Sequence, residues 1–154
     1  MNQGIPNIAS LVNGILAFVR GAAQEMEIGE VERQLLPMVM AVGRAALTEF
    51  VAVKGTGYAG REIVEAQGQR FPYVRDRTCA YRSIFGTIPI RRAYYHAPGA
   101  PGIFPLDGAL NLPERGYSYV VQEFSSRLAV TMSYEDASEI LGSFFQVKMP
   151  IRSL

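Results

Sequence analysis

The stretch YRSIFGTIPIRRAYY, residues 81 to 95, decides the expected fold of this chain. Aromatic and β-branched residues flank Phe85-Gly86 and predict two antiparallel strands joined by a tight turn. The strands are expected from Tyr81 to Phe85 and from Thr87 to Tyr95. Pro89 favours an edge position for the second strand, because proline cannot donate a hydrogen bond to a neighbouring strand. Alternate residues of that strand share one face, namely Ile88, Ile90, Arg92 and Tyr94.

Two segments with helical periodicity precede these strands. In the first, apolar residues recur at helical spacing, at Ile8, Leu11, Val12, Ile15, Leu16 and Val19. In the second, the spacing resembles a coiled-coil seam, at Ile28, Val31, Leu35, Met38, Val42 and Ala45. The second helix is expected to begin near Gly29 and to kink or restart at Pro37. Together they predict a helical hairpin over residues 1 to 56, which either closes on the domain's own core or pairs with a second copy.

Helices are expected again in the C-terminal third of the chain, after the loop HAPGAPG (residues 96 to 102). Ser118 is expected to cap one helix, and Ser133 with Asp136 resembles a capping box for another. The apolar stripes of these helices are Val121, Phe124 and Leu128, then Ala137, Ile140, Leu141 and Phe144. Pro150 and IRSL are expected to begin a third helix that Leu154 truncates. The outline resembles a helix-turn-helix, which generic helical hairpins share.

The expected fold class is therefore α+β. We expect an N-terminal helical hairpin (residues 1 to 56), a small antiparallel, basic β-rich segment (57 to 116) and C-terminal helices with an incomplete helix-turn-helix-like end (117 to 154). Apolar residues make up 49% of the chain and charged residues 19%, which excludes wholesale disorder. A single cysteine excludes an internal disulfide and a multi-cysteine zinc site.

The distribution of charge is more informative than the net charge of +1. Residues 70 to 92 carry six arginines against Asp76 alone, a balance of +5, whereas the segments on either side each carry −2. Aromatic residues interleave with these arginines at Phe71, Tyr73, Tyr81, Tyr94 and Tyr95. Arginine contacts phosphate and reads guanine, and aromatic rings stack on exposed bases. An equally strong alternative is a solvated strand face with tyrosines packed beneath it.

Three other patterns have simpler structural interpretations. GTGYAG (residues 55 to 60) matches a dinucleotide-binding fingerprint, but the following βαβ unit is missing, so these glycines are expected to end the second helix. Asp76, Asp107 and Glu135 could form the carboxylate triad of a DDE-type two-metal site. Such a site needs its carboxylates on adjacent strands of a ribonuclease-H-like sheet, which the expected hairpin and helices do not supply. Cys79 and His96 are the only cysteine and histidine, and two ligands are too few for a structural zinc site. Cys79 is expected to be a small buried strand residue, and His96 a surface turn residue.

The segments RSIFGTIPIRRAYY (82 to 95), PLDGALNLPE (105 to 114) and SYVVQ (118 to 122) together resemble the N-terminal region of ISKra-type insertion-sequence transposases. The likeness extends through the Ser133 helix into VKMPIRSL, and covers roughly residues 57 to 154. Some members carry Cys-x-x-Cys pairs that suggest a zinc ribbon. This chain has Ala97 and Ala100 at that spacing, which argues against zinc here.

The resemblance implies a segment that binds transposon ends and assembles, followed in the parent family by a metal-dependent DDE catalytic domain. This chain contains no part of that domain, so no catalysis, metal or cofactor is expected within it. The expected partners are double-stranded DNA of the terminal repeats and either a second copy or a full-length transposase. The expected DNA-binding residues are Arg70, Arg75, Arg77, Arg82, Arg91, Arg92, Tyr94, Tyr95, Lys148 and Arg152.

An alternative is a truncated, transposase-derived interaction protein, either a regulator that dimerises with full-length transposase through the N-terminal helices or a non-functional remnant. The chain start lacks the cationic and small-residue features of a secretory signal. No apolar run is expected to reach the roughly 20 residues that cross a bilayer. These observations predict a cytoplasmic protein without a membrane partner.

Overall fold

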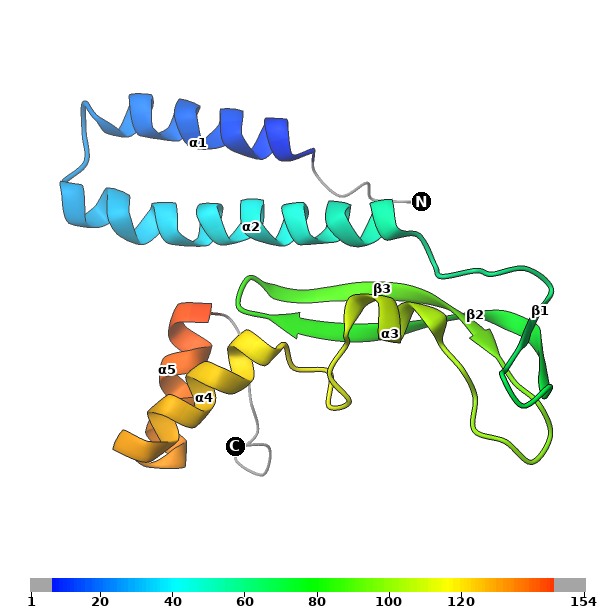
Figure 1. Ribbon diagram of the computed structural model, residues 1–154. Coiled ribbons are helices and arrows are strands. Elements are labelled where there is room, and N and C mark those ends of the chain that lie inside the picture. The colour runs from blue at the N-terminus through cyan, green and yellow to red at the C-terminus, as the bar shows by residue number, and fades with distance from the viewer. Residues whose placement is uncertain (1–6, 146–154) are drawn as a thin grey trace.

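The computed structural model describes residues 7 to 145 and has an α+β fold (Figure 1). Its elements are α1 (Ile8–Ala22), α2 (Ile28–Lys54), β1 (Glu62–Val64), β2 (Arg70–Ser83), β3 (Gly86–Tyr95), α3 (Pro105–Leu110), α4 (Tyr119–Thr131) and α5 (Tyr134–Phe145). Helix α2 runs alongside the sheet and α1 packs on the far side of α2. Helices α4 and α5 lie near the end of the sheet that carries the β2–β3 turn.

The sheet is antiparallel with the order β1-β2-β3, so β3 is an outer strand, as Pro89 predicts. The turn lies where expected, and β3 begins one residue before the predicted strand. The prediction for the first strand was wrong in length, because β2 begins at Arg70 and ends at Ser83. Pro72 and the register shift that follows Tyr73 interrupt the strand pattern of its first half, which pairs with both β1 and β3.

Apolar residues cover both faces of the hairpin, at different places. Near the turn, Ile88 and Ile90 are almost fully buried and pack with Leu106 of α3. Leu47 and Val51 of α2 cover the same cluster. A second cluster, on the opposite face and nearer the β1 end, consists of Phe71, Ala93, Tyr95 and Ala97. The sheet is therefore covered by different segments at its two ends.

Helix α2 begins at Ile28 and continues through Pro37 as one helix. Of the two outcomes expected at Pro37, a kink or a restart, the restart is therefore wrong. Pro37 is exposed and lines the groove between α1 and α2. Among residues 7 to 145, α2 is the one helix long and apolar enough to cross a membrane by length and composition. The expectation that no apolar segment reaches that length was therefore wrong. In this structure α2 contacts α1 and β3, but only 6% of its apolar stretch is buried.

The glycines of GTGYAG end α2 and open a turn, as expected. Gly55 is the C-cap residue of α2 at φ 71°, and Gly57 and Gly60 also have positive φ. A β-carbon at Gly57 would lie 2.8 Å from the backbone nitrogen of Leu106, so this close approach requires glycine. A dinucleotide-binding fingerprint would require a strand directly before these glycines, but residues 50 to 54 lie within α2.

The expected caps of the C-terminal helices are present. The Ser118 hydroxyl accepts a hydrogen bond from the Val121 amide of α4. The Ser133 hydroxyl accepts one from the Asp136 amide and donates to its carboxylate at 2.6 Å. The third helix expected from Pro150 lies outside the described residues, so the helix-turn-helix remains a prediction.

The β2–β3 turn rests on α2 where the helix has no side chain. A β-carbon at Gly43 would lie 2.4 Å from the Phe85 ring, whereas Gly14 of α1 has nothing within 4 Å of that position. We expect Gly43→Ala to lower the free energy of unfolding by about 1–3 kcal/mol through overpacking. Gly14→Ala should raise it by up to about 1 kcal/mol, because alanine favours a helix more than glycine. Equal effects in urea denaturation would contradict this contact.

Candidate nucleic-acid interface

Two exposed arginines lie on one face of β2, toward the β1 end of the sheet. Arg75 and Arg77 alternate along the strand, and their register partners on β3 are Tyr94 and Arg92. The Arg77 guanidinium stacks over the Tyr94 ring, 3.8 Å from its centroid. Stacking leaves the N–H edge of a guanidinium available to donate hydrogen bonds. Neither Arg75 nor Arg77 forms an ion pair within residues 7 to 145.

The Tyr94 ring is held in place from several directions. The Phe104 ring lies 4.9 Å away and the His96 ring 6.0 Å away, between centroids. A β-carbon at Gly102 would lie 2.1 Å from the Tyr94 ring, so the loop backbone packs directly on it. His96, expected as a surface turn residue, is half-buried beside this ring. The arrangement fixes the surface on which Arg77 rests.

Arg92 shares this face but is not available to an outside ligand. Its side chain is only 15% exposed and forms an ion pair with Asp107 of α3. The Phe104 ring lies 4.0 Å from its guanidinium carbon. Arg92 Nε and Asp107 Oδ1 are buried without a hydrogen-bond partner. Arg92 thus joins β3 to α3, whereas the sequence suggested a contact with DNA.

The opposite face of the hairpin carries paired charges. Arg91 Nε lies 2.7 Å from the Asp76 carboxylate, and the Tyr73 hydroxyl donates a hydrogen bond of 3.0 Å to the same group. Partial burial, reinforced by this hydrogen bond, raises the pKa of the Tyr73 phenol. Because the Arg91 side chain is 72% exposed, its pairing is that of a surface ion pair and adds little stability.

The remaining expected residues are distributed over the rest of the sheet. Arg70 pairs with Glu62 of β1 at 2.8 Å, and Arg82 lies over the Tyr117 ring at 5.0 Å, near the other end of β2. Tyr95 is fully buried; its hydroxyl accepts a bond from the Ala59 amide and donates one to the Gly60 carbonyl. Tyr95 is therefore a structural residue, which corrects its expected place among the DNA contacts. Lys148 and Arg152 lie outside the described residues.

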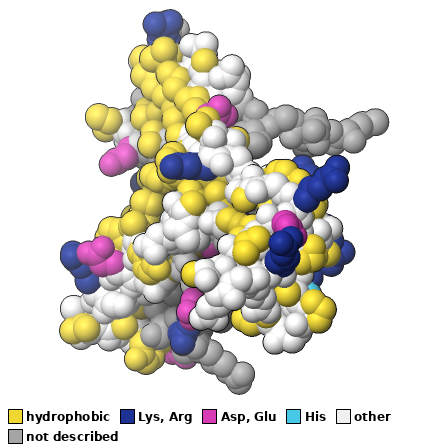
Figure 2. Space-filling model, turned by 45° about the vertical axis from the view of Figure 1, so that its right-hand side comes forward, with side chains coloured by type: hydrophobic (Ala, Val, Ile, Leu, Met, Phe, Trp, Pro, Cys, Tyr) yellow, Lys and Arg dark blue, Asp and Glu magenta, His cyan; other side chains and the backbone are white. Residues whose placement is uncertain are grey.

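One exposed arginine near this end of the sheet was missed by sequence reasoning. The carbonyl oxygen of Arg61 accepts a 2.9 Å hydrogen bond from the Tyr73 amide, which joins the residue before β1 to β2. Arg61 lies directly after the GTGYAG turn, which was the one sequence feature that could have drawn attention to it. It was missed because it lies outside the arginine-rich segment, residues 70 to 92. Figure 2 shows Lys and Arg side chains gathered with hydrophobic ones over the right-hand part of the molecule.

The other groups considered for chemistry are far apart. Cys79 is opposite Ile90 in the sheet and His96 follows the end of β3, about 20 Å further along at strand spacing. Asp76 and Asp107 each pair with an arginine, and Glu135 lies in the first turn of α5. Within residues 7 to 145, no three His, Cys, Asp or Glu side chains come together as metal ligands.

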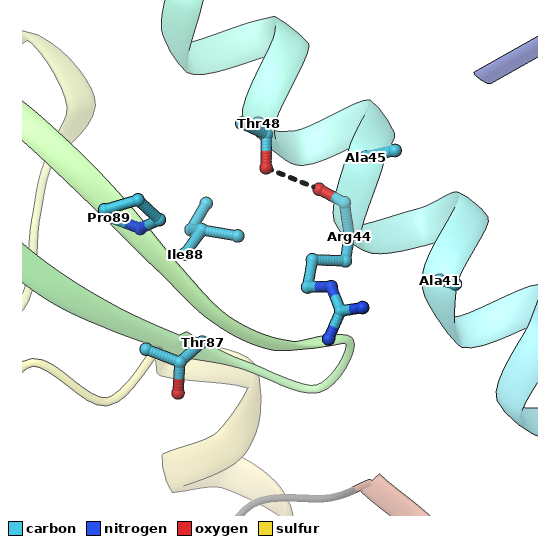
Figure 3. Close-up of a pocket in the computed structure, with 7 residues that line it drawn as sticks. All are labelled: Ala41, Arg44, Ala45, Thr48, Thr87, Ile88 and Pro89. Carbon is cyan, nitrogen blue, oxygen red and sulfur yellow. Dashed lines mark hydrogen bonds between the residues drawn. The ribbon is translucent and has the colours of Figure 1, made fainter. Parts of the chain in front are cut away.

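Two cavities flank the sheet near α2 and α3. One, of about 220 Å³, lies between α2 and β3 and has Arg44 as the only charged residue of its lining (Figure 3). The Arg44 side chain extends toward the β2–β3 turn. The other, of about 310 Å³, is lined in part by Cys79, Arg92 and Asp107. The first cavity has the single Arg44 guanidinium, and the second has the internal Arg92–Asp107 pair and the Glu114 carboxylate. Neither cavity therefore resembles a phosphate site.

No protein-family model, curated protein or solved structure matches this chain. The arrangement of the described residues is therefore the basis for a functional proposal. That arrangement reduces the expected arginine band to a smaller surface, formed by Arg75, Arg77 and Tyr94 with Arg61 nearby.

The contrast between the neighbours Arg92 and Arg91 is testable. Arg92→Ala leaves Asp107 as a partly buried charge without a partner, and should lower the free energy of unfolding by on the order of 3 kcal/mol. Arg91→Ala removes an exposed pair and should cost less than about 1 kcal/mol. Urea denaturation followed by circular dichroism measures both. Equal, small losses would show that the Arg92 pair contributes no more than a surface one.

Burial also predicts the reactivity of Cys79. Desolvation raises the pKa of its thiol, while the nearby Arg92 acts in the opposite direction. Less thiolate is then present at a given pH, so at about pH 8 iodoacetamide should modify Cys79 more slowly in the folded protein than in urea. Mass spectrometry of timed samples measures the two rates, with a free cysteine peptide as the control for urea. A folded rate equal to that of the peptide would contradict the burial.

Proposed function

We propose that this chain binds double-stranded DNA through the β1–β2 end of its sheet, as the DNA-binding and assembly segment of an ISKra-like transposase. The observation that carries the proposal is the pair Arg75 and Arg77 on one face of β2. Both are exposed and without a carboxylate partner within residues 7 to 145, and Arg77 is oriented by Tyr94.

The chemistry of these groups suits a phosphate backbone. Guanidinium groups donate charge-assisted hydrogen bonds to phosphate oxygens, often two at a time. A preorganised side chain loses less conformational entropy on binding, and the stacked Arg77 meets that condition. A small number of phosphate contacts predicts moderate affinity that decreases steeply with salt. Base-specific reading of transposon ends would require further contacts, for which Lys148 and Arg152 remain candidates.

A second candidate function is that of a transposase-derived interaction protein that does not contact DNA. The observation in its favour is the exposure of large apolar side chains on α1 and α2, such as Leu16 and Val39. The two candidates differ in what they require. DNA binding depends on the arginines of β2, whereas an interaction protein depends on the helical hairpin.

Replacing both arginines should weaken DNA binding without unfolding the protein. With a fluorescein-labelled mixed-sequence DNA duplex, we expect Arg75→Gln/Arg77→Gln to lower affinity at least tenfold at low salt. The slope of log K against log salt should decrease by about two, because each phosphate contact contributes about 0.9. Fluorescence anisotropy over a salt series measures both quantities.

The matched control is Arg20→Gln/Arg127→Gln, which removes the same charge from α1 and α4. It should leave the slope unchanged. Loss of binding in both variants would assign the effect to net charge. If the unaltered protein binds neither this duplex nor candidate terminal repeats at low salt, the proposal is wrong.

A further inference from the structure

We propose that two copies of this chain associate through one face of the α1/α2 hairpin to form a four-helix interface. This face, called here the hairpin face, comprises Val12, Leu16, Val19, Leu36 and Val39. The inference concerns a surface other than the DNA-binding arginines and does not depend on DNA binding.

The hairpin face is distinct from the contact between the two helices. Within the described residues, the one element that α1 contacts extensively is α2. The residues of α1 that are partly buried in this contact include Leu11, Ile15 and Phe18. Val12, Leu16 and Val19 each follow one of these residues in sequence, so they lie about 100° further around the helix. They are 40%, 46% and 39% exposed. α1 therefore has a second apolar stripe that its own chain does not cover.

Helix α2 continues the same face. Leu36 and Val39 are 40% and 52% exposed, although α2 packs on α1 and on β3. None of the residues that line the groove on the other side of the hairpin is among the exposed large apolar side chains. They include Ser10, Leu11 and Gly14 from α1, and Pro37 and Met38 from α2. The exposed large apolar side chains thus lie on one side of the two-helix layer. Figure 2 shows hydrophobic side chains continuing along this upper part of the molecule.

The hairpin face has the size of a small interface. Val12 to Val19 span about 10 Å of α1. On α2 the exposed apolar stripe continues from Leu36 and Val39 to Phe50, about three turns after Val39 on the same side, and spans about 21 Å. With each helix about 10 Å wide, the projected face is about 300 Å². Protruding side chains increase its accessible area toward the roughly 600 Å² that each partner buries in the smaller specific complexes.

The absence of charge on α1 favours a second copy as the occupant. In a two-fold symmetric interface the same patch meets itself, so like charges approach each other near the axis. Between Ile8 and Ala22 the one charged residue is Arg20, in the last turn. A membrane surface is a poorer match, because helices that lie on anionic lipid carry several Lys or Arg residues on the polar face.

The test uses the full chain and a matched pair of double variants. Analytical ultracentrifugation over a concentration series should show a monomer–dimer equilibrium for the unaltered protein. Leu16→Glu/Val39→Glu places four carboxylates in the proposed interface and should raise the dissociation constant at least about 100-fold. Ala17→Glu/Gln34→Glu adds the same charge at exposed positions outside the hairpin face and should leave the equilibrium unchanged.

Each other outcome overturns the proposal. A monomer at the highest concentrations, with circular dichroism showing a folded protein, would show that the hairpin face does not pair. So would equal weakening in both double variants. Flotation with vesicles of phosphatidylcholine and phosphatidylglycerol tests the lipid alternative. A monomeric protein that floats with them, and loses this property in Leu16→Glu/Val39→Glu, would assign the face to a membrane. DNA binding by the Leu16→Glu/Val39→Glu protein, measured separately, distinguishes failure here from failure of the proposed function.

Discussion

Burial of Ile88 and Ile90 between the hairpin and its two covering helices is the contact on which the rest of the arrangement depends. Each side chain is at most 2% exposed and contributes roughly 1.5–3 kcal/mol by removing apolar surface from water. The cluster brings α2, α3 and β3 together, although they are far apart in sequence. The Phe85 ring on Gly43 and the Arg92–Asp107 pair then set how the hairpin lies against α2 and α3.

Local patterns in the sequence were sufficient for much of this fold. The periodicity of α1 and α2, the turn at Phe85-Gly86, the Ser118 cap and the helix end at Gly55 were all predictable from neighbouring residues. The first half of β2 was not, because Pro72 and the register shift that follows it interrupt its alternation, and its partners on β1 and β3 define it as a strand. Continuation of α2 through Pro37 was likewise not predictable, because a proline inside a helical pattern is compatible with either a kink or a restart.

The candidate site was only partly predictable, for a related reason. Sequence spacing placed six arginines in one segment, but the sheet divides them between two faces and pairs three with carboxylates. Asp107, the partner of Arg92, is 15 residues away along the chain. Whether an arginine is available to an outside anion depends on such distant partners. The number of arginines in the segment therefore overestimated how many are free to bind a ligand. Arg75 and Arg77 remain because both are exposed and no carboxylate in residues 7 to 145 pairs with them. Arg82 has no carboxylate partner there either, but it is half-buried over a tyrosine ring.

The length of the β2–β3 hairpin also determines where its exposed arginines lie. Phe85 rests on α2 at one end of β2–β3, and Arg75 is about eight residues, or roughly 27 Å, along the strand from the turn. Strand length thus sets how far the arginines lie from the β2–β3 turn and from α4 and α5 beside it. Lengthening both strands by two residues would keep each side chain on its face of the sheet and move the arginines about 7 Å further from the turn. Homologous chains that differ in this distance would be expected to hold their ligands at correspondingly different spacings, without any change in the residues that touch them.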